Sequence, residues 1–370
     1  MNSAYGIQAQ QAGAGMAAGA LAAPAAAAMA DLPILKWRLA SSFPKSLDSI
    51  HSSTESLARQ VALLTGGRFQ IQVFAAGELV PSAAVLDAVK DGTVEIGHSA
   101  SYYYVGKDPT FALDTGIPFG LNSRQQMAWM HDGGGLELLR DFFREYAIHN
   151  IPCGATGTQM GGWFRKEIRS VEDLKGLKFR VGGFAGQVLA RLGVVPQQIP
   201  AGDIYAALEK GAIDAAEWVG PYDDLKLGFQ RVAKYYYYPG FWEGGPQLTV
   251  YVNLKHWNAL PPEYQAALEN ACALAHLEMQ ARYDARSPAA LRQLIASGTQ
   301  LRPFSYEIMS AAYQAAHALY DETAAKNPRF RKIYEPWKKF RDDQLQWFAV
   351  AESHFDAFMQ ATRAAARSRK

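Results

Sequence analysis

Residues 35–98 alternate between strand-like and helix-like segments, and this alternation constrains the fold more than any other feature. Leu35–Ser42 and Phe69–Phe74 carry apolar residues at alternate positions, which is typical of strands with one buried face. Ser46–Leu64 and Ala83–Lys90 have helical spacing and are followed by glycines, and Val94–His98 is a further short strand. Such a β-α-β-α-β series predicts a mainly parallel, doubly wound sheet.

The segment Leu86–Gly97 has a weak counterpart at Tyr205–Ala216. Each consists of a helix, a glycine that ends it, and a short strand that carries a carboxylate. The two lie too far apart in sequence for a solenoid repeat. They favour two similar α/β lobes with a cleft between them, which is a preferred place for a small-molecule site. A coincidental match is the alternative.

The rest of the chain continues the mixture of strand and helix patterns. Its 370 residues are enough for two domains. Strands are expected at Ile151–Thr158, Gly162–Arg165, Leu177–Val181, Ile213–Val219, Val232–Tyr238, Leu248–Asn253 and Thr299–Phe304. Helices are expected at Ala185–Leu192, Ile204–Glu209, Pro262–Leu294, Tyr306–Lys326 and Pro336–Arg363. The predicted fold class is therefore α/β.

The expected last helix carries a wide apolar stripe. The stripe consists of Trp337, Phe340, Trp347, Phe348, Phe355, Phe358 and Met359. A stripe of this kind packs into a core in many chains, but its aromatic content also suits a surface that binds a partner. Both interpretations remain open at the level of sequence.

The first thirty residues differ from the rest of the chain. Met1–Ala30 contains no charged residue and ends in Ala28-Met29-Ala30, which is the A-x-A pattern of a signal-peptide cleavage site. No Lys or Arg precedes Lys36, so the usual basic segment is missing and the natural start is expected to lie upstream. We interpret residues 1–30 as a signal peptide and expect export to the periplasm. A disordered alanine-rich leader is the alternative.

Composition and motifs exclude several functional classes. Apolar residues make up 49% and charged residues 19%, which indicates a globular chain. The net charge is +2 without a long basic run, which argues against a nucleic-acid binder. No G-x-S-x-G, H-E-x-x-H or complete phosphate loop occurs, so no enzyme motif is present. Cys153 and Cys272 lack metal-ligand spacing and are interpreted as buried apolar residues, with a disulfide as the alternative.

Arg180 follows an alternating strand, Leu177–Val181, directly before the turn Gly182-Gly183. In open α/β sheets, ligands bind at the carboxyl ends of strands. A planar, permanently charged donor at that place suits a carboxylate, which it can hold with two parallel hydrogen bonds. A structural or surface ion pair is the alternative.

Polar residues gather at the other strand ends of the second region. Gln159 lies between two expected strands, Glu217 and Trp218 close another, and Glu243 lies in a glycine-rich turn after the tyrosine strand. Two carboxylates beside one arginine would repel an anionic ligand unless a cation joined them. Oxygen ligands of this kind suit Na⁺ or Ca²⁺. The alternative is that each Glu is a solvated turn residue.

Three tyrosines, residues 102–104, follow a strand of the first region. They can either form a wall of the cleft or pack in the core. We include Tyr102 among the expected ligand-binding residues.

Several segments together resemble one known family, the solute-binding proteins of tripartite ATP-independent periplasmic (TRAP) transporters. These segments are Val171–Val181, with its Leu-Lys-Gly-Leu-Lys-Phe-Arg run, Asp91–Gly97 and Glu209–Asp214. Three more segments resemble the branch that binds 2-oxo acids and lactate: Gln159–Trp163, Ala216–Pro221 and Gly240–Gly245. The similarity extends over residues 34–360.

The resemblance implies a two-lobed (class II-like) periplasmic binding protein in which each lobe is a doubly wound mixed sheet, with long C-terminal helices. We expect lobe I at residues 34–157 and about 247–285, and lobe II at residues 158–246 and about 286–335. Residues 336–363 would form an amphipathic helix, through which this branch is described as forming homodimers.

The resemblance also implies a function and roles for individual residues. Arg180 and Gln159 would hold the substrate carboxylate, with Tyr102, Trp218 and Glu243 also in contact with it. A cation, Na⁺ or alternatively Ca²⁺, would be bound by Gln159, Glu217, the Trp218 carbonyl and Glu243. The protein would bind a pyruvate-like 2-oxo monocarboxylate, catalyse no reaction, and deliver the ligand to a TRAP permease. Lactate, a C4-dicarboxylate or another organic acid is the alternative ligand, and a carboxylate-processing α/β enzyme is the alternative class.

Overall fold

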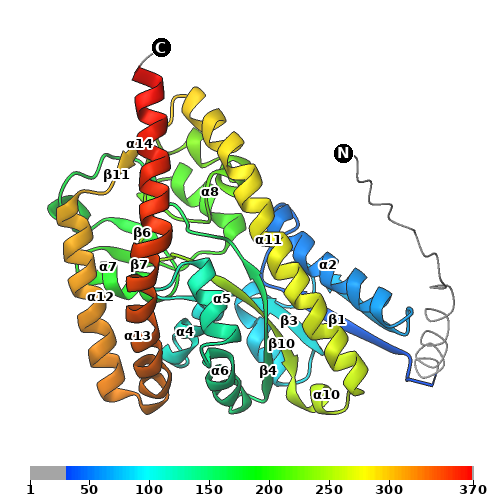
Figure 1. Ribbon diagram of the computed structural model, residues 1–370. Helices are drawn as coiled ribbons and strands as arrows, with labels where there is room; N and C mark the ends of the chain where they lie inside the picture. The colour runs from blue at the N-terminus through cyan, green and yellow to red at the C-terminus, as the bar shows by residue number, and fades with distance from the viewer. Residues whose placement is uncertain (1–30, 369–370) are drawn as a thin grey trace, which may run out of the picture.

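A computed structural model describes residues 31–368 of the protein. The expected signal peptide, residues 1–30, lies outside the described residues. The chain forms two mixed sheets, as expected for a two-lobed α/β protein (Figure 1). Within residues 31–368, no helix is long and apolar enough to cross a membrane.

The first sheet has five strands in the order β2-β1-β3-β10-β4. Their bounds are β1 Leu35–Ser41, β2 Phe69–Phe74, β3 Ile96–Ser99, β4 Ile148–Ala155 and β10 Gln247–Asn253. The first three strands are parallel, because each is joined to the next by a crossover through a helix. Strand β10 is antiparallel to both β3 and β4, because it enters from the second sheet. This sheet is the centre of lobe I.

The second sheet has six strands in the order β11-β9-β5-β8-β6-β7. Their bounds are β5 Gly162–Phe164, β6 Lys178–Arg180, β7 Val195–Gln197, β8 Ala215–Ala216, β9 Tyr235–Tyr238 and β11 Gln300–Pro303. Strands β6, β7 and β8 are parallel, whereas β5 is antiparallel to β8 and β9. This sheet is the centre of lobe II, and the chain crosses between the lobes three times: after β4, after β9, and between β10 and β11.

Helices cover both sheets. In lobe I they are α2 Asp48–Leu64, α3 Val85–Lys90, α4 Ala112–Thr115, α5 Ser123–His131, α6 Gly135–Arg144 and α10 Leu254–Asn258. In lobe II they are α7 Gly183–Ala190, α8 Ala201–Glu209 and α9 Pro221–Leu227. The longer C-terminal helices are α11 Pro262–Ala296, α12 Tyr306–Lys326, α13 Pro328–Phe348 and α14 His354–Ser368. Short 3₁₀ turns, such as η2 Ser101–Tyr104, connect several of them.

The apolar periodicity of α2 and α11 explains how lobe I is held together. The two helices pack side by side on the sheet, with α11 running diagonally across the molecule (Figure 1). The buried cluster under them includes Leu39, Leu57, Phe69, Val250 and Leu268. Cys153 and Cys272 belong to the same cluster as free, buried thiols, which confirms their interpretation as buried apolar residues.

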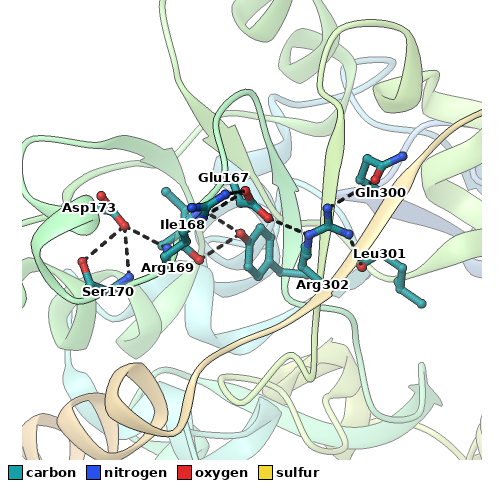
Figure 2. Close-up of polar contacts among 9 residues, drawn as sticks. Glu167, Ile168, Arg169, Ser170, Asp173, Gln300, Leu301 and Arg302 are labelled. Atoms are coloured by element: carbon teal, nitrogen blue, oxygen red, sulfur yellow. Dashed lines mark hydrogen bonds and ion pairs between the residues drawn. The ribbon is translucent and has the colours of Figure 1, made fainter.

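The connection from β5 to β6 is fastened to the edge of the second sheet by polar contacts (Figure 2). Glu167 accepts a hydrogen bond from Arg302 Nε of β11 at 2.7 Å and pairs with Arg169. The Tyr237 hydroxyl group lies within hydrogen-bonding distance of both the amide and the carbonyl of Ile168. The Asp173 carboxylate accepts hydrogen bonds from the backbone amides of Arg169 and Ser170, which closes the turn. These contacts fix the path of the chain into β6, which carries Arg180.

The two segments that resembled each other in sequence have the same local structure. Leu86–Gly97 covers α3 and the start of β3, and Tyr205–Ala216 covers α8 and β8. Both helices are followed by a glycine with positive φ, at +74° for Gly92 and +72° for Gly211. One strand lies in each sheet, as the prediction of two similar lobes requires.

The prediction that the last helix starts at Pro336 is wrong. Helix α13 starts at Pro328, where the Asn327 side chain accepts a hydrogen bond from the Phe330 amide at 3.0 Å. Asn followed by Pro is a strong helix start, and Pro336 is accommodated inside the helix. A π turn, Ala349–Ser353, then separates α13 from α14. Helices α5 and α6 were also not predicted.

Candidate functional site

A small cavity between the two lobes is lined by all the residues that were expected from the sequence to bind the ligand or the cation. The space inside it that the centre of a water molecule can reach is about 20 Å³. Its walls include Tyr102, Gln159, Arg180, Glu217, Trp218 and Glu243. The remaining lining residues are Phe43, Ile50, Ala100, Tyr103, Thr156, Val219, Pro246 and Leu248. Most of these are apolar residues of lobe I or of the crossings between the lobes. Among them, only Tyr103 was expected from the sequence as part of the cleft wall.

Arg180 is at the end of β6 and is only 2% exposed. Its Nη1 donates to the Glu217 carbonyl oxygen at 2.8 Å and forms an ion pair with the Glu217 carboxylate, and its Nε donates to the Ile199 carbonyl at 3.1 Å. The guanidinium carbon lies 4.8 Å from the centre of the Trp218 ring. Among residues 31–368, Nη2 has no hydrogen-bond partner. The side chain is therefore held rigidly, with one donor group left for a ligand.

Two buried carboxylates face this single arginine. Glu217 is 1% exposed and Glu243 is 3% exposed. Burial raises the pKa of Glu217, and the positive charge of Arg180 opposes this shift. Burial, together with repulsion by Glu217, raises the pKa of Glu243 well above its ordinary value. With both carboxylates ionised, the site is short of one positive charge, which is an unfavourable state in a low-dielectric cavity.

Two oxygens of the site are buried without a partner among the described residues. They are Oε1 of Gln159 and Oε2 of Glu243. The Gln159 amide is oriented by its Nε2, which donates to the Thr156 hydroxyl group at 3.1 Å. A buried acceptor without a donor costs free energy, and a cation removes that cost. An amide oxygen and carboxylate oxygens are the ligands of hard cations such as Na⁺ and Ca²⁺, so the residues fit an ion of this kind.

Glycines allow the segments of the site to approach one another. The Gly240 amide donates to the Gln159 carbonyl at 2.9 Å, and a Cβ at position 240 would lie 2.7 Å from that carbonyl oxygen. The ring of Tyr102, from lobe I, lies on Gly182 of lobe II, where a Cβ would be 2.7 Å from Tyr102 Cε2. Glycine at these positions brings Gln159 next to the Glu243 turn and lets Tyr102 pack against the turn that follows Arg180.

The three consecutive tyrosines have different environments. Tyr102 and Tyr103 line the cavity. Tyr104 instead packs in the core, where its ring contacts Phe111 and its hydroxyl group donates to Ser99 Oγ at 3.2 Å. Both interpretations of this segment therefore apply, each to different residues.

The sequence matches the family described as bacterial extracellular solute-binding protein, family 7, over residues 40–327. It is 52% identical to a monocarboxylate 2-oxoacid-binding periplasmic protein of Nostoc sp. strain PCC 7120, over 90% of this chain and 92% of that protein.

Solved structures of TRAP solute-binding proteins are also similar. One from Bordetella bronchiseptica has 54% identity and a TM-score of 0.89, covering 90% of this chain and 99% of its own; that protein is a dimer with calcium and picolinate in one of its sites. Proteins from Colwellia psychrerythraea and Pseudoalteromonas atlantica have 39% and 38% identity, respectively. Each has a TM-score of 0.84, and each alignment covers 86% of this chain and 98% of the other protein. The first contains calcium and pyruvate, and the second contains sodium and pyruvate.

Proposed function

Because the chain belongs to the family-7 bacterial extracellular solute-binding proteins of TRAP transporters, we propose that its interlobe cavity binds a pyruvate-like 2-oxo monocarboxylate together with Na⁺ or Ca²⁺. One observation carries this proposal. The unpartnered oxygens of Gln159 and Glu243 line the same buried cavity as the guanidinium of Arg180. A cation satisfies the oxygens, and a carboxylate satisfies the guanidinium.

The roles of the residues follow from their chemistry. Arg180 holds the ligand carboxylate, with the Gln159 amide beside it and Tyr102 closing the cavity from lobe I. Gln159, Glu217, the Trp218 carbonyl and Glu243 hold the cation. A ligand with an oxygen next to its carboxylate can share that cation, which favours 2-oxo acids over simple monocarboxylates. Trp218 and Glu243 also contact the ligand.

The cavity wall favours a small monocarboxylate over a dicarboxylate. Among the described residues that line it, Arg180 is the only cationic one. Part of the wall is formed by apolar groups such as Phe43, Ile50 and Leu248, which suit a short alkyl group. A second ligand carboxylate would be desolvated there without a partner.

The family consists of transport receptors and not enzymes, so the bound acid leaves unchanged. We propose that lobe I (residues 34–157 and about 247–285) and lobe II (158–246 and about 286–335) close on the ligand in the periplasm. The closed receptor then delivers the acid to TRAP permease subunits in the membrane.

A thermal-shift panel tests the ligand and the cation together. A ligand that binds only the native state raises the unfolding temperature with its concentration. We expect pyruvate to raise it in the presence of Na⁺ or Ca²⁺, and to raise it less when neither ion is present. Lactate and succinate in the same panel separate the alternatives. No shift with any 2-oxo acid would contradict the proposal, and turnover of one would indicate an enzyme.

We also propose that the protein forms a homodimer through its C-terminal helix. The apolar stripe divides in the structure: Trp337 is 2% exposed and belongs to the core, whereas Phe355 is 64% and Phe358 is 68% exposed on α14. Helix α14 continues from α13 along the outside of the molecule (Figure 1). Exposed aromatic rings on such a helix are typical of an interface.

A nearby groove suits the same helix from a second copy. It lies between α5 and α11 and includes Met127 and Leu277, which are 46% and 65% exposed. Replacing both Phe355 and Phe358 with glutamate should give a monomer in light scattering, because two charges would be buried in an apolar contact. Tyr306→Glu, at a position that is 88% exposed on α12, is the control and should stay dimeric. A dimer that survives the double substitution would exclude this interface.

A further inference from the structure

The proposed cation ligands come from three separate segments of lobe II. Gln159 precedes β5, Glu217 and Trp218 lie between β8 and α9, and Glu243 follows β9. Each of these strands ends before the ligand residue or starts after it, so the pairing of the strands alone does not set the distances between the oxygens. Backbone hydrogen bonds join the segments at single points, from the Gln159 amide to the Glu243 carbonyl at 3.0 Å and from the Met160 amide to the Val219 carbonyl at 3.1 Å. A side-chain contact shared by all three elements would add to these bonds.

Asp224, in the first turn of α9, contacts the elements that carry the other two segments. Its Oδ2 accepts a hydrogen bond from Trp163 Nε1 of β5 at 3.0 Å and another from the Tyr236 hydroxyl group of β9 at 2.7 Å. The two donor residues are opposite each other in the sheet and their rings are stacked, with centroids 4.1 Å apart. Helix α9 itself continues from Trp218 through Val219 and Gly220. One carboxyl oxygen therefore joins α9, β5 and β9.

Asp224 is an unfavourable residue for stability alone. It is 1% exposed and does not line the ligand cavity, and its Oδ1 is buried without a partner among the described residues. In either protonation state one polar atom remains unsatisfied, and a well-packed apolar residue would avoid that cost. The carboxyl group therefore requires an explanation other than packing.

We propose that Asp224 is a positioning residue for the cation site, which holds the Gln159, Glu217 and Glu243 segments at the spacing that a bound ion requires. The inference rests on the proposed function, because it assumes that these segments bind a cation. It adds a residue outside the cavity on which cation affinity depends. Loss of a group that hydrogen-bonds a metal ligand directly typically lowers metal affinity by about 10- to 100-fold. Asp224 acts one contact further out, through Trp163 and Tyr236, so the lower end of that range applies.

The preceding residue, Asp223, is a matched comparison. It is on the same helix, is fully buried, and its Oδ2 accepts a hydrogen bond from the Tyr283 hydroxyl group at 2.6 Å. Tyr283 belongs to α11, which carries none of the proposed cation ligands. Tyr236→Phe and Tyr283→Phe thus each remove one buried hydroxyl group that donates to a carboxyl group of α9. Only the first joins two ligand-bearing segments, because Tyr236 is on β9, which leads to Glu243, whereas Tyr283 joins α9 to α11 alone.

The test is calcium titration of the two variants by calorimetry, with the wild-type protein alongside. We expect Tyr236→Phe to weaken calcium binding by about tenfold, the lower end of the effect of losing a partner of a metal ligand. Tyr283→Phe should leave calcium affinity unchanged, although both variants lose thermal stability. Equal calcium affinities in the two variants would overturn the positioning role. Absence of cation binding, sodium included, by the wild-type protein would instead contradict the proposed function.

Substitutions of Asp224 itself provide a second test, which measures calcium affinity in a different pair of variants. Burial raises the pKa of Asp224 to about 8, so asparagine is its matched neutral replacement. The amide oxygen of Asp224→Asn can accept both hydrogen bonds, and we expect near wild-type calcium affinity. Asp224→Leu removes both and should lose affinity at least as much as Tyr236→Phe. Normal calcium binding by a folded Asp224→Leu variant, which lacks both hydrogen bonds, would overturn the inference; if the leucine variant does not fold, the tyrosine pair decides.

Discussion

Replacing Arg180 with alanine should abolish pyruvate binding while the protein remains folded. Arg180 is the only positive charge among the described lining residues of the cavity. A hydrogen bond to a charged group contributes roughly 1.5–3 kcal/mol, so the loss of both N–H donors of the free Nη2 group weakens binding by at least about a hundredfold. Calorimetric titration of pyruvate into the variant measures this loss, and circular dichroism confirms that the fold is retained.

Two further variants sharpen the interpretation. Arg180→Lys keeps the charge but loses the planar pair of donors, and we expect an affinity between those of the wild type and the alanine variant. Arg302→Ala removes another arginine at a strand of the same sheet, where it pairs with Glu167 on the outside (Figure 2), and should bind pyruvate normally. Micromolar pyruvate affinity in Arg180→Ala would contradict the assignment of the site.

The second large effect is expected at the cation. Glu243→Gln keeps the size of the side chain but removes one of the two buried carboxylate charges that face Arg180. Pyruvate affinity should fall by at least about tenfold, because the ion that bridges ligand and protein is held less tightly. Chelation of Ca²⁺ in a sodium-free buffer should weaken binding by the wild-type protein in the same way.

Glu322→Gln is the control for this substitution. Glu322 is half exposed and pairs with Arg191 far from the cavity, so its variant should bind like the wild type. If neither Glu243→Gln nor removal of the cations changes pyruvate affinity, the cation bridge is wrong, while the receptor function is unaffected.

The raised pKa of Glu243 also predicts how cation-dependent pyruvate binding changes with pH. Burial first, and repulsion by Glu217 second, favour the protonated form of Glu243 in the empty site. A cation binds the ionised form and competes with the proton. Cation-dependent binding of pyruvate should therefore weaken as the pH is lowered, and calorimetric titrations at a series of pH values measure this loss.

The sequence was sufficient to predict most of the site chemistry. Arg180, Glu217 and Glu243 all lie next to short strands that periodicity and glycine positions identify, and side chains at such ends converge at one edge of a sheet. The structure brings them together with Gln159 and Trp218 in a single cavity. Their roles toward a ligand remain a proposal that the variants above test.

The sequence was insufficient wherever a contact joins distant residues without a local pattern. Asp224 appears as one of two adjacent acids in a short helix, and only the structure shows that Trp163 and Tyr236 donate to it. The apolar wall from Phe43, Ile50 and Leu248 was missed because an apolar residue at a core position and one at a cavity have the same local pattern. Pro336 resembles a helix start in the local sequence, but the stronger signal is Asn327 followed by Pro328, and the helix that begins there continues through Pro336.

By itself, the sequence determined the α/β class, the series of strands and helices in residues 35–98, and the types of group available to a ligand. These properties depend on near neighbours along the chain, through periodicity, turns and capping. Only the tertiary structure decided that two carboxylates share one buried arginine, that the aromatic stripe is core up to Trp337 and exposed on α14, and that Tyr102 covers Gly182. Desolvation and charge balance are properties of a closed cavity, whose residues come from both lobes and are far apart in sequence.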